Sequence, residues 1–81
     1  MMDGKIKQDC NIPIGKNIRN VRIAKGIGQT ELVRRMQLLG VDMTRETLVK
    51  IERGIQHIYA TQLRAIRDLL ETSYDELLKG E

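Results

Sequence analysis

The sequence predicts an all-α domain made of five short helices. Isoleucine, leucine, valine and methionine recur at the three- and four-residue spacing of helices, and no alternating run of β-branched residues predicts a strand. The chain contains only two aromatic residues, Tyr59 and Tyr74, so the core must be built from those four residue types. Its 81 residues have room for one domain.

The first thirteen residues show no periodic pattern and include a glycine, an asparagine and a proline. We therefore predict a flexible arm over residues 1–13 and a helical domain over residues 14–81. The first helix is predicted over residues 15–25, and Gly26 and Gly28 end it. Its apolar face consists of Ile14, Ile18 and Val21.

A second helix is predicted over residues 30–39, with Gln29 or Thr30 as its cap and Gly40 directly after its end. Its apolar stripe consists of Leu32, Val33, Met36 and Leu39.

A third helix is predicted over residues 45–53. Thr44 is a good N-cap residue, and Gly54 ends the helix. Leu48 and Ile51 are expected to face the core.

The last part of the chain is predicted to contain two further helices. A loop over residues 55–58 leads into a helix over residues 59–71, and Ser73 caps a short helix over residues 74–78. The residues expected to face the core are Leu63, Ile66, Leu69 and Leu70, followed by Leu77 and Leu78.

The charges are distributed unevenly along the chain. Residues 14–57 carry nine lysines and arginines against four acidic residues, whereas residues 58–81 carry three against five. A basic region followed by an acidic end is typical of a protein with one face for a polyanion. An ordinary solvated surface explains the same counts, and charge alone does not decide between the two.

Composition argues against several classes of protein. The chain has no apolar run long enough to span a membrane and no secretory signal at its N-terminus. A single cysteine, Cys10, excludes a disulfide within the chain and favours a cytoplasmic location. No nucleophile elbow, phosphate-binding loop or metal-ligand cluster is present, so we predict neither enzymatic activity nor a cofactor.

Four sequence stretches resemble a known family. The chain contains IGKNIRNVR at 14–22, QTELV at 29–33, TRETLVKIERG at 44–54 and a last stretch from Leu63 to Leu78 that ends in SYDELL at 73–78. In this order they resemble the helices of Xre-type regulators, the family of Cro and the phage repressors. Two departures are visible. Val33 stands where the family has alanine, and the segment between Met36 and Thr44 is longer than usual, which we interpret as an extra turn of the second helix.

The resemblance implies a compact lambda-repressor-like domain in which the second and third helices form a helix-turn-helix. It further implies a bacterial or phage transcriptional regulator, a repressor, that binds double-stranded DNA as a homodimer on an inverted repeat. The dimer surface is expected near Tyr74, Leu77 and Leu78. A second interpretation remains open, because the same scaffold also serves as a protein-interaction module or an antitoxin.

In this family the third helix enters the major groove. The corresponding positions here are Thr44, Arg45, Glu46, Thr47 and Lys50. Arg45 can contact a guanine edge with two hydrogen bonds, and Lys50 can reach a base or a phosphate. Glu46 can accept from cytosine, although the favoured interpretation is a first-turn acid that complements the helix dipole.

The remaining positions implied by the resemblance lie at phosphates or inside the fold. Gln29 and Thr30 are expected to hold a phosphate at the start of the second helix, or simply to cap it. Gln56 and His57 are expected near the DNA backbone. For His57 the favoured alternative is an exposed loop histidine, and no set of zinc ligands accompanies it. Arg22 and Glu52 are expected to form an ion pair that ties the first helix to the third.

Overall fold

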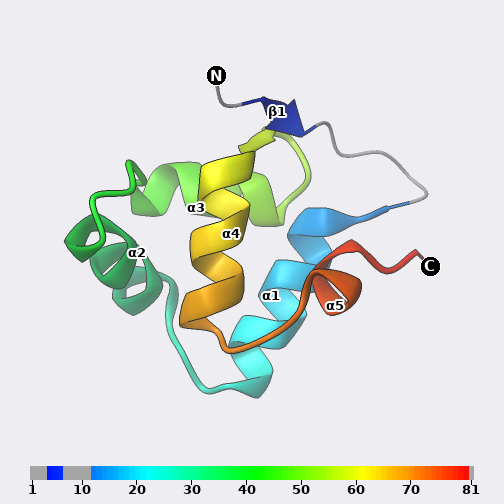
Figure 1. Ribbon diagram of the computed structural model, residues 1–81, viewed down its shortest axis with the longest axis horizontal. Helices are drawn as coiled ribbons and strands as arrows, with labels where there is room; N and C mark the ends of the chain where they lie inside the picture. Colours follow the sequence, from blue (N-terminus) through cyan, green and yellow to red (C-terminus); the bar gives the residue numbers. More distant parts are fainter. Residues whose placement is uncertain (1–3, 7–11, 81) are drawn as a thin grey trace.

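The computed structural model describes residues 4–6 and 12–80 and contains five helices and two short strands (Figure 1). The helices are α1 (Ile14–Ala24), α2 (Gln29–Leu38), α3 (Arg45–Glu52), α4 (Ala60–Leu69) and α5 (Tyr74–Leu78). The strands are β1 (Lys5–Ile6) and β2 (Ile58–Tyr59). The described part of the chain is therefore a small, mostly helical domain with five helices, as the sequence predicts.

The helices surround one core. Figure 1 shows α4 in the middle of the view, with α2 on one side and α1 and α5 on the other. Helix α1 packs against α3 and α5, and α2 packs against α3 and α4. None of the helices in the described ranges is long and apolar enough to cross a membrane.

The predicted helix positions hold within one or two residues. Helices α3 and α5 begin at Arg45 and Tyr74, as predicted, because Thr44 and Ser73 cap them through their side chains. Helix α4 is shorter than predicted. It begins after Tyr59, which belongs to a strand, and ends before Glu71, whose positive φ of 52° stops the helix.

The two strands are the main difference from the predicted fold. Lys5 pairs with Tyr59 and Ile6 with Ile58 in an antiparallel ladder, and the Ala60 N–H donates to the Gly4 carbonyl at 3.1 Å. The prediction of a flexible arm is therefore wrong at Lys5 and Ile6, and the predicted loop is wrong at Ile58. A ladder of two residues has no periodic signature, so only the long-range backbone pairing reveals it. Residues 1–3 and 7–11 of the predicted arm, including Cys10, lie outside the described residues.

The core is aliphatic. The buried apolar residues are Ile14, Ile18, Leu32, Val33, Met36, Met43, Leu48, Ile51, Ile58, Leu63, Ala65, Ile66, Leu70 and Leu77. The predicted helix faces are thus largely confirmed, with Val21, Leu69 and Leu78 packed at the edge of the core. Met43 and Ile58 were not predicted as core residues, because both lie in connections rather than in a helical stripe.

The end of α2 explains one wrong prediction about the core. Leu39 is 59% exposed, although the helical stripe places it inward. Gly40 adopts a φ of 79°, and the N–H groups of Gly40 and Val41 donate to the carbonyls of Gln37 and Met36 at 2.9 and 3.0 Å. These two bonds form a Schellman motif, which turns the chain and packs Val41 against the core instead.

Three amide side chains join segments that are distant in the sequence or lie in different elements. The Gln37 amide donates to the Met43 carbonyl at 2.8 Å, and the Gln62 amide donates to the Asp42 carbonyl at 2.9 Å. The connection before α3 is therefore attached to both α2 and α4. At the other end of the molecule, the buried Asn17 donates to the carbonyls of Leu77 and Lys79, both at 3.0 Å, and holds α5 against α1.

Candidate nucleic-acid interface

Helix α3 has a buried face and an exposed polar face. Leu48, Ile51 and Glu52 are buried, which leaves Arg45, Glu46 and Lys50 exposed to solvent. Because Arg45 is the first residue of α3, its side chain projects from the N-terminal end of the helix. This end of α3 carries the positions that sequence analysis selects.

Thr44 and Thr47 define the start of α3. The Thr44 hydroxyl oxygen accepts from the Thr47 N–H at 3.1 Å, and the same hydroxyl donates to the Thr47 hydroxyl at 3.0 Å. Both residues therefore act as a cap within the protein, which holds the first turn of α3 in one conformation. Because the Thr47 hydroxyl oxygen accepts in this bond, its O–H group can still donate a hydrogen bond to another acceptor.

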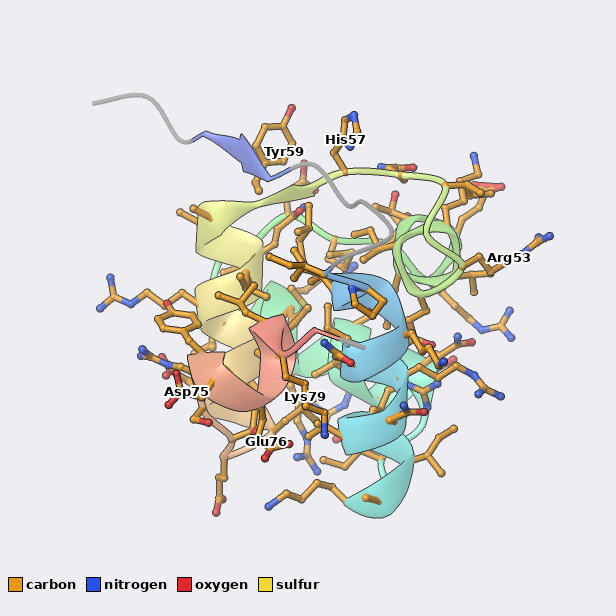
Figure 2. All side chains as sticks on the ribbon, turned by 90° about the vertical axis from the view of Figure 1, so that its right-hand side faces the viewer. Arg53, His57, Tyr59, Asp75, Glu76 and Lys79 are labelled. Carbon is orange, nitrogen blue, oxygen red and sulfur yellow. The ribbon has the colours of Figure 1, made fainter. Side chains whose placement is uncertain are left out.

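Arg53 adds a cation that sequence analysis did not select. It is the C-cap residue of α3, is exposed, and stands three residues after Lys50, so the two residues are neighbours on one side of the helix. Figure 2 shows its side chain directed away from the body of the molecule. The three-residue spacing from Lys50 is the sequence signal that identifies it.

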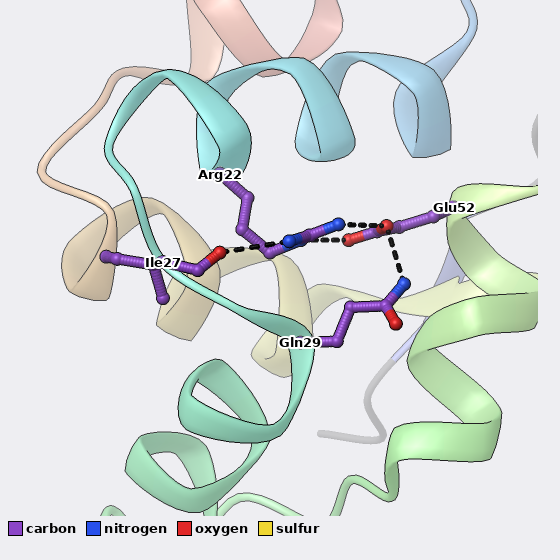
Figure 3. Close-up of polar contacts among 4 residues, drawn as sticks. All are labelled: Arg22, Ile27, Gln29 and Glu52. Atoms are coloured by element: carbon purple, nitrogen blue, oxygen red, sulfur yellow. Dashed lines mark hydrogen bonds and ion pairs between the residues drawn. The ribbon is translucent and has the colours of Figure 1, made fainter.

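A buried ion pair supports α3 from behind (Figure 3). The Arg22 Nε donates to Glu52 Oε2 at 2.7 Å, and Arg22 Nη2 donates to Glu52 Oε1 at 2.9 Å. The two side chains are only 9% and 2% exposed. The third guanidinium nitrogen donates to the Ile27 carbonyl at 2.9 Å. The expected ion pair between Arg22 and Glu52 is thus present, and it also fixes the turn between α1 and α2.

Gln29 belongs to this buried network. Its amide nitrogen donates to Glu52 Oε1 at 3.0 Å, so the side chain connects the start of α2 to the end of α3 (Figure 3). The amide nitrogen that the resemblance assigns to a phosphate is therefore directed at a carboxylate within the chain. The second N–H of this amide and the backbone N–H at the helix start remain as donors for an external anion.

The first turn of α2 has exposed backbone donors. The N-cap residue is Gly28, which provides no side-chain cap, and Thr30 in the first turn is exposed. Helix N-termini with uncapped N–H groups attract anions, because these donors and the helix dipole act in the same direction. The start of α2 is therefore suited to binding a phosphate, which is the role expected of Thr30.

Glu31 pairs with both arginines of α2 and offsets one of their two charges. It accepts from Arg34 at 2.7 and 3.1 Å and from Arg35 at 2.7 Å. The hydrogen bonds from Arg34 and Arg35 lower the pKa of Glu31 to about 2, and Glu31 raises the pKa of Arg34. These arginines therefore contribute less positive potential than their number suggests.

The lowered pKa of Glu31 predicts a pH dependence of stability. A carboxylate with a lowered pKa in the folded state stabilises the protein above its unfolded pKa of 4.5, and this contribution is lost as the pH falls towards about 2. Thermal melting of the wild type and of Glu31→Gln should differ at neutral pH and converge across that window. In Arg34→Ala/Arg35→Ala, the NMR titration of Glu31 should return towards 4.5. A midpoint that stays near 2 in this variant would contradict the assigned cause.

Gln56 and His57 lie in the exposed segment between α3 and β2. In Figure 2, His57 and Arg53 extend from the upper part of the molecule, whereas Asp75 and Glu76 of α5 lie in the lower part. Within the described ranges no cluster of histidine, cysteine, aspartate and glutamate is suited to a metal ion.

The prediction that Leu77 of α5 belongs to a dimer surface is wrong. Leu77 is fully buried within its own chain and cannot face a partner. Leu78 is half-buried, and the Arg67 guanidinium lies over the Tyr74 ring at 4.5 Å. Helix α5 therefore uses much of its apolar surface to close the core.

No protein-family model matches the chain, and neither the curated proteins nor the solved structures give a significant match.

Proposed function

We propose that this protein binds double-stranded DNA in a sequence-specific manner and acts as a small transcriptional repressor. The observation that carries the proposal is the polar face of α3. A helix capped at Thr44 and supported by the buried Arg22–Glu52 pair presents Arg45 and Lys50 to solvent. A capped helix with one cation at its first position and a second in its last turn, both exposed, is the arrangement with which helix-turn-helix proteins read the major groove and hold the flanking phosphates.

In the proposed complex, α2 and α3 form the helix-turn-helix and α3 is the recognition helix. Arg45, at the first position of α3, donates two hydrogen bonds to a guanine edge. Lys50 and Arg53 follow on the same helix and neutralise phosphates. Glu46 accepts from cytosine or complements the helix dipole, and both roles agree with its exposed first-turn position.

Phosphate contacts on either side would fix the register of α3 on the duplex. The uncapped N–H groups at Gln29 and Thr30 suit one phosphate, with the Gln29 side chain holding α2 against α3. Gln56 and His57, in the segment after α3, are placed to contact the backbone beyond it. In the proposal these contacts position the protein, whereas Arg45 provides sequence discrimination.

A selection of random DNA duplexes tests this proposal. The wild type should enrich an inverted repeat. Arg45→Ala should lose discrimination at one base pair of each half-site by about 10-fold to 100-fold, which corresponds to about 1–3 kcal/mol. Lys50→Ala should weaken binding to all sequences and reduce the slope of log affinity against log salt by about 1. Lys79→Ala is the control, because Lys79 pairs with Glu76 beside α5. No enrichment by the wild type would overturn the proposal.

A second candidate function is a protein-interaction module or an antitoxin-like component. The exposed leucines at the end of α2, Leu38 and Leu39, favour this candidate, since a DNA-binding surface does not need them. Salt dependence separates the two functions. Binding to DNA weakens steeply as salt releases counterions from phosphates, whereas binding through leucines does not.

A further inference from the structure

An apolar groove between the end of α2 and α4 has no role in the proposed DNA contacts. One hollow of about 250 Å³ is lined by Leu39, Val41, Thr61, Arg64, Ala65 and Asp68. A second hollow of about 440 Å³ shares Val41 and Thr61 with the first, so the two are adjacent. The neighbouring leucines are strongly exposed, Leu38 by 72% and Leu39 by 59%.

We propose that this groove, defined by the residues that line the first hollow, is the surface through which two copies of this chain associate. The first argument is steric. The same face carries both a hollow that is large enough for a leucine side chain and the exposed leucine Leu39. A two-fold symmetric interface requires a patch that complements itself, and a protrusion beside a hollow fulfils this requirement.

The second argument is the order of charges along α4. Thr61, Arg64, Ala65 and Asp68 have helical spacing and line the same hollow. If two α4 helices meet in antiparallel orientation, with the axis between Arg64 and Asp68, each Arg64 faces Asp68 of the other copy. The small, buried side chain of Ala65 lines the hollow between these two charges and leaves it open. The charges therefore complement a second copy of the same surface.

Both charged groups are available for such a contact. Arg64 is exposed and makes no hydrogen bond or ion pair within the described part of the chain. Asp68 is exposed, and both of its hydrogen bonds from Arg67, at 2.7 and 2.9 Å, end on Oδ1. Its second oxygen can accept from the arginine of the partner. Each dimer would thus contain two symmetric Arg64–Asp68 pairs, one on either side of the two-fold axis.

Sedimentation of the purified chain without DNA tests the apolar part of the surface. The wild type should show a monomer–dimer equilibrium between micromolar and millimolar concentration. Leu39→Glu should raise the dissociation constant by more than about 100-fold, because the symmetric contact loses one buried leucine from each copy. Ile23→Glu is the matched control, since Ile23 is 52% exposed on α1 and should have no effect. A wild type that stays monomeric, or equal effects of the two variants, would overturn the proposal.

A charge exchange tests the symmetric pairing itself. Arg64→Glu and Asp68→Arg should each weaken self-association, because each places like charges opposite each other twice. A mixture of the two variants should form a heterodimer, because both contacts then join opposite charges. Circular dichroism of each variant confirms that it is folded. Two single variants that dimerise like the wild type, or a mixture that stays monomeric, would contradict the assigned surface. Since DNA is absent, failure here leaves the proposed DNA binding unaffected.

Discussion

Arg22→Met is expected to lower the free energy of unfolding by about 3–5 kcal/mol, which is the typical effect of removing one partner from a buried ion pair. The variant leaves the Glu52 carboxylate, 2% exposed, with the Gln29 amide but without the two bonds from the guanidinium. The Ile27 carbonyl also loses its donor. The melting temperature should fall by more than about 10 °C in a domain of this size.

The double variant Arg22→Met/Glu52→Leu shows how much of the stability lost in Arg22→Met comes from the unpaired buried charge and how much from lost packing. Replacing both partners of a buried pair by apolar side chains is often close to neutral, so most of the lost stability should return. The DNA sequence selected by Arg22→Met below its melting temperature should equal that of the wild type, because the pair lies behind α3. An unchanged melting temperature in Arg22→Met would show that the pair does not hold α1 to α3.

Leu48→Ala is expected to destabilise the protein by about 2–5 kcal/mol. Leu48 is fully buried on the inner face of α3, so the substitution removes apolar contact and leaves a cavity beneath the proposed recognition helix. Urea unfolding of the purified variant provides the measurement, with the midpoint lowered and the slope unchanged.

Leu38→Ala is the matched control for Leu48→Ala. The same side chain is removed, but Leu38 is 72% exposed, so the free energy of unfolding should change by less than about 0.5 kcal/mol. Equal losses in the two variants would show that Leu48 does not occupy the core described above.

Local signals in the sequence determined where the helices begin and end. Thr44 and Ser73 cap the helices that follow them, and Gly26, Gly40 and Gly54 adopt the positive φ that ends the helices before them. Capping and left-handed turns depend on residues within one turn of each other, so they can be predicted without knowledge of the fold. For the same reason the inward faces of α1, α3 and α4 follow largely from the helical period.

The candidate site could be predicted in part. The exposed positions of Arg45, Glu46 and Lys50 follow from the helical period, since Leu48 and Ile51 face the core. The inward direction of the Gln29 amide does not follow, because its partner Glu52 is 23 residues away and is reached only when α2 packs on α3. The pairing of Arg22 with Glu52 was available from the family resemblance but not from the residues alone.

Only the tertiary structure decided which apolar side chains outside the helical stripes are buried and which stay exposed. Met43 and Ile58 enter the core although neither lies in a helix, whereas Leu38 at the end of α2 stays exposed. The pairing of β1 with β2 likewise joins segments more than fifty residues apart. The physical reason is the same in each case. The sequence determines local backbone geometry, but burial depends on which distant segment covers a side chain, and that is set by the packing of the whole chain.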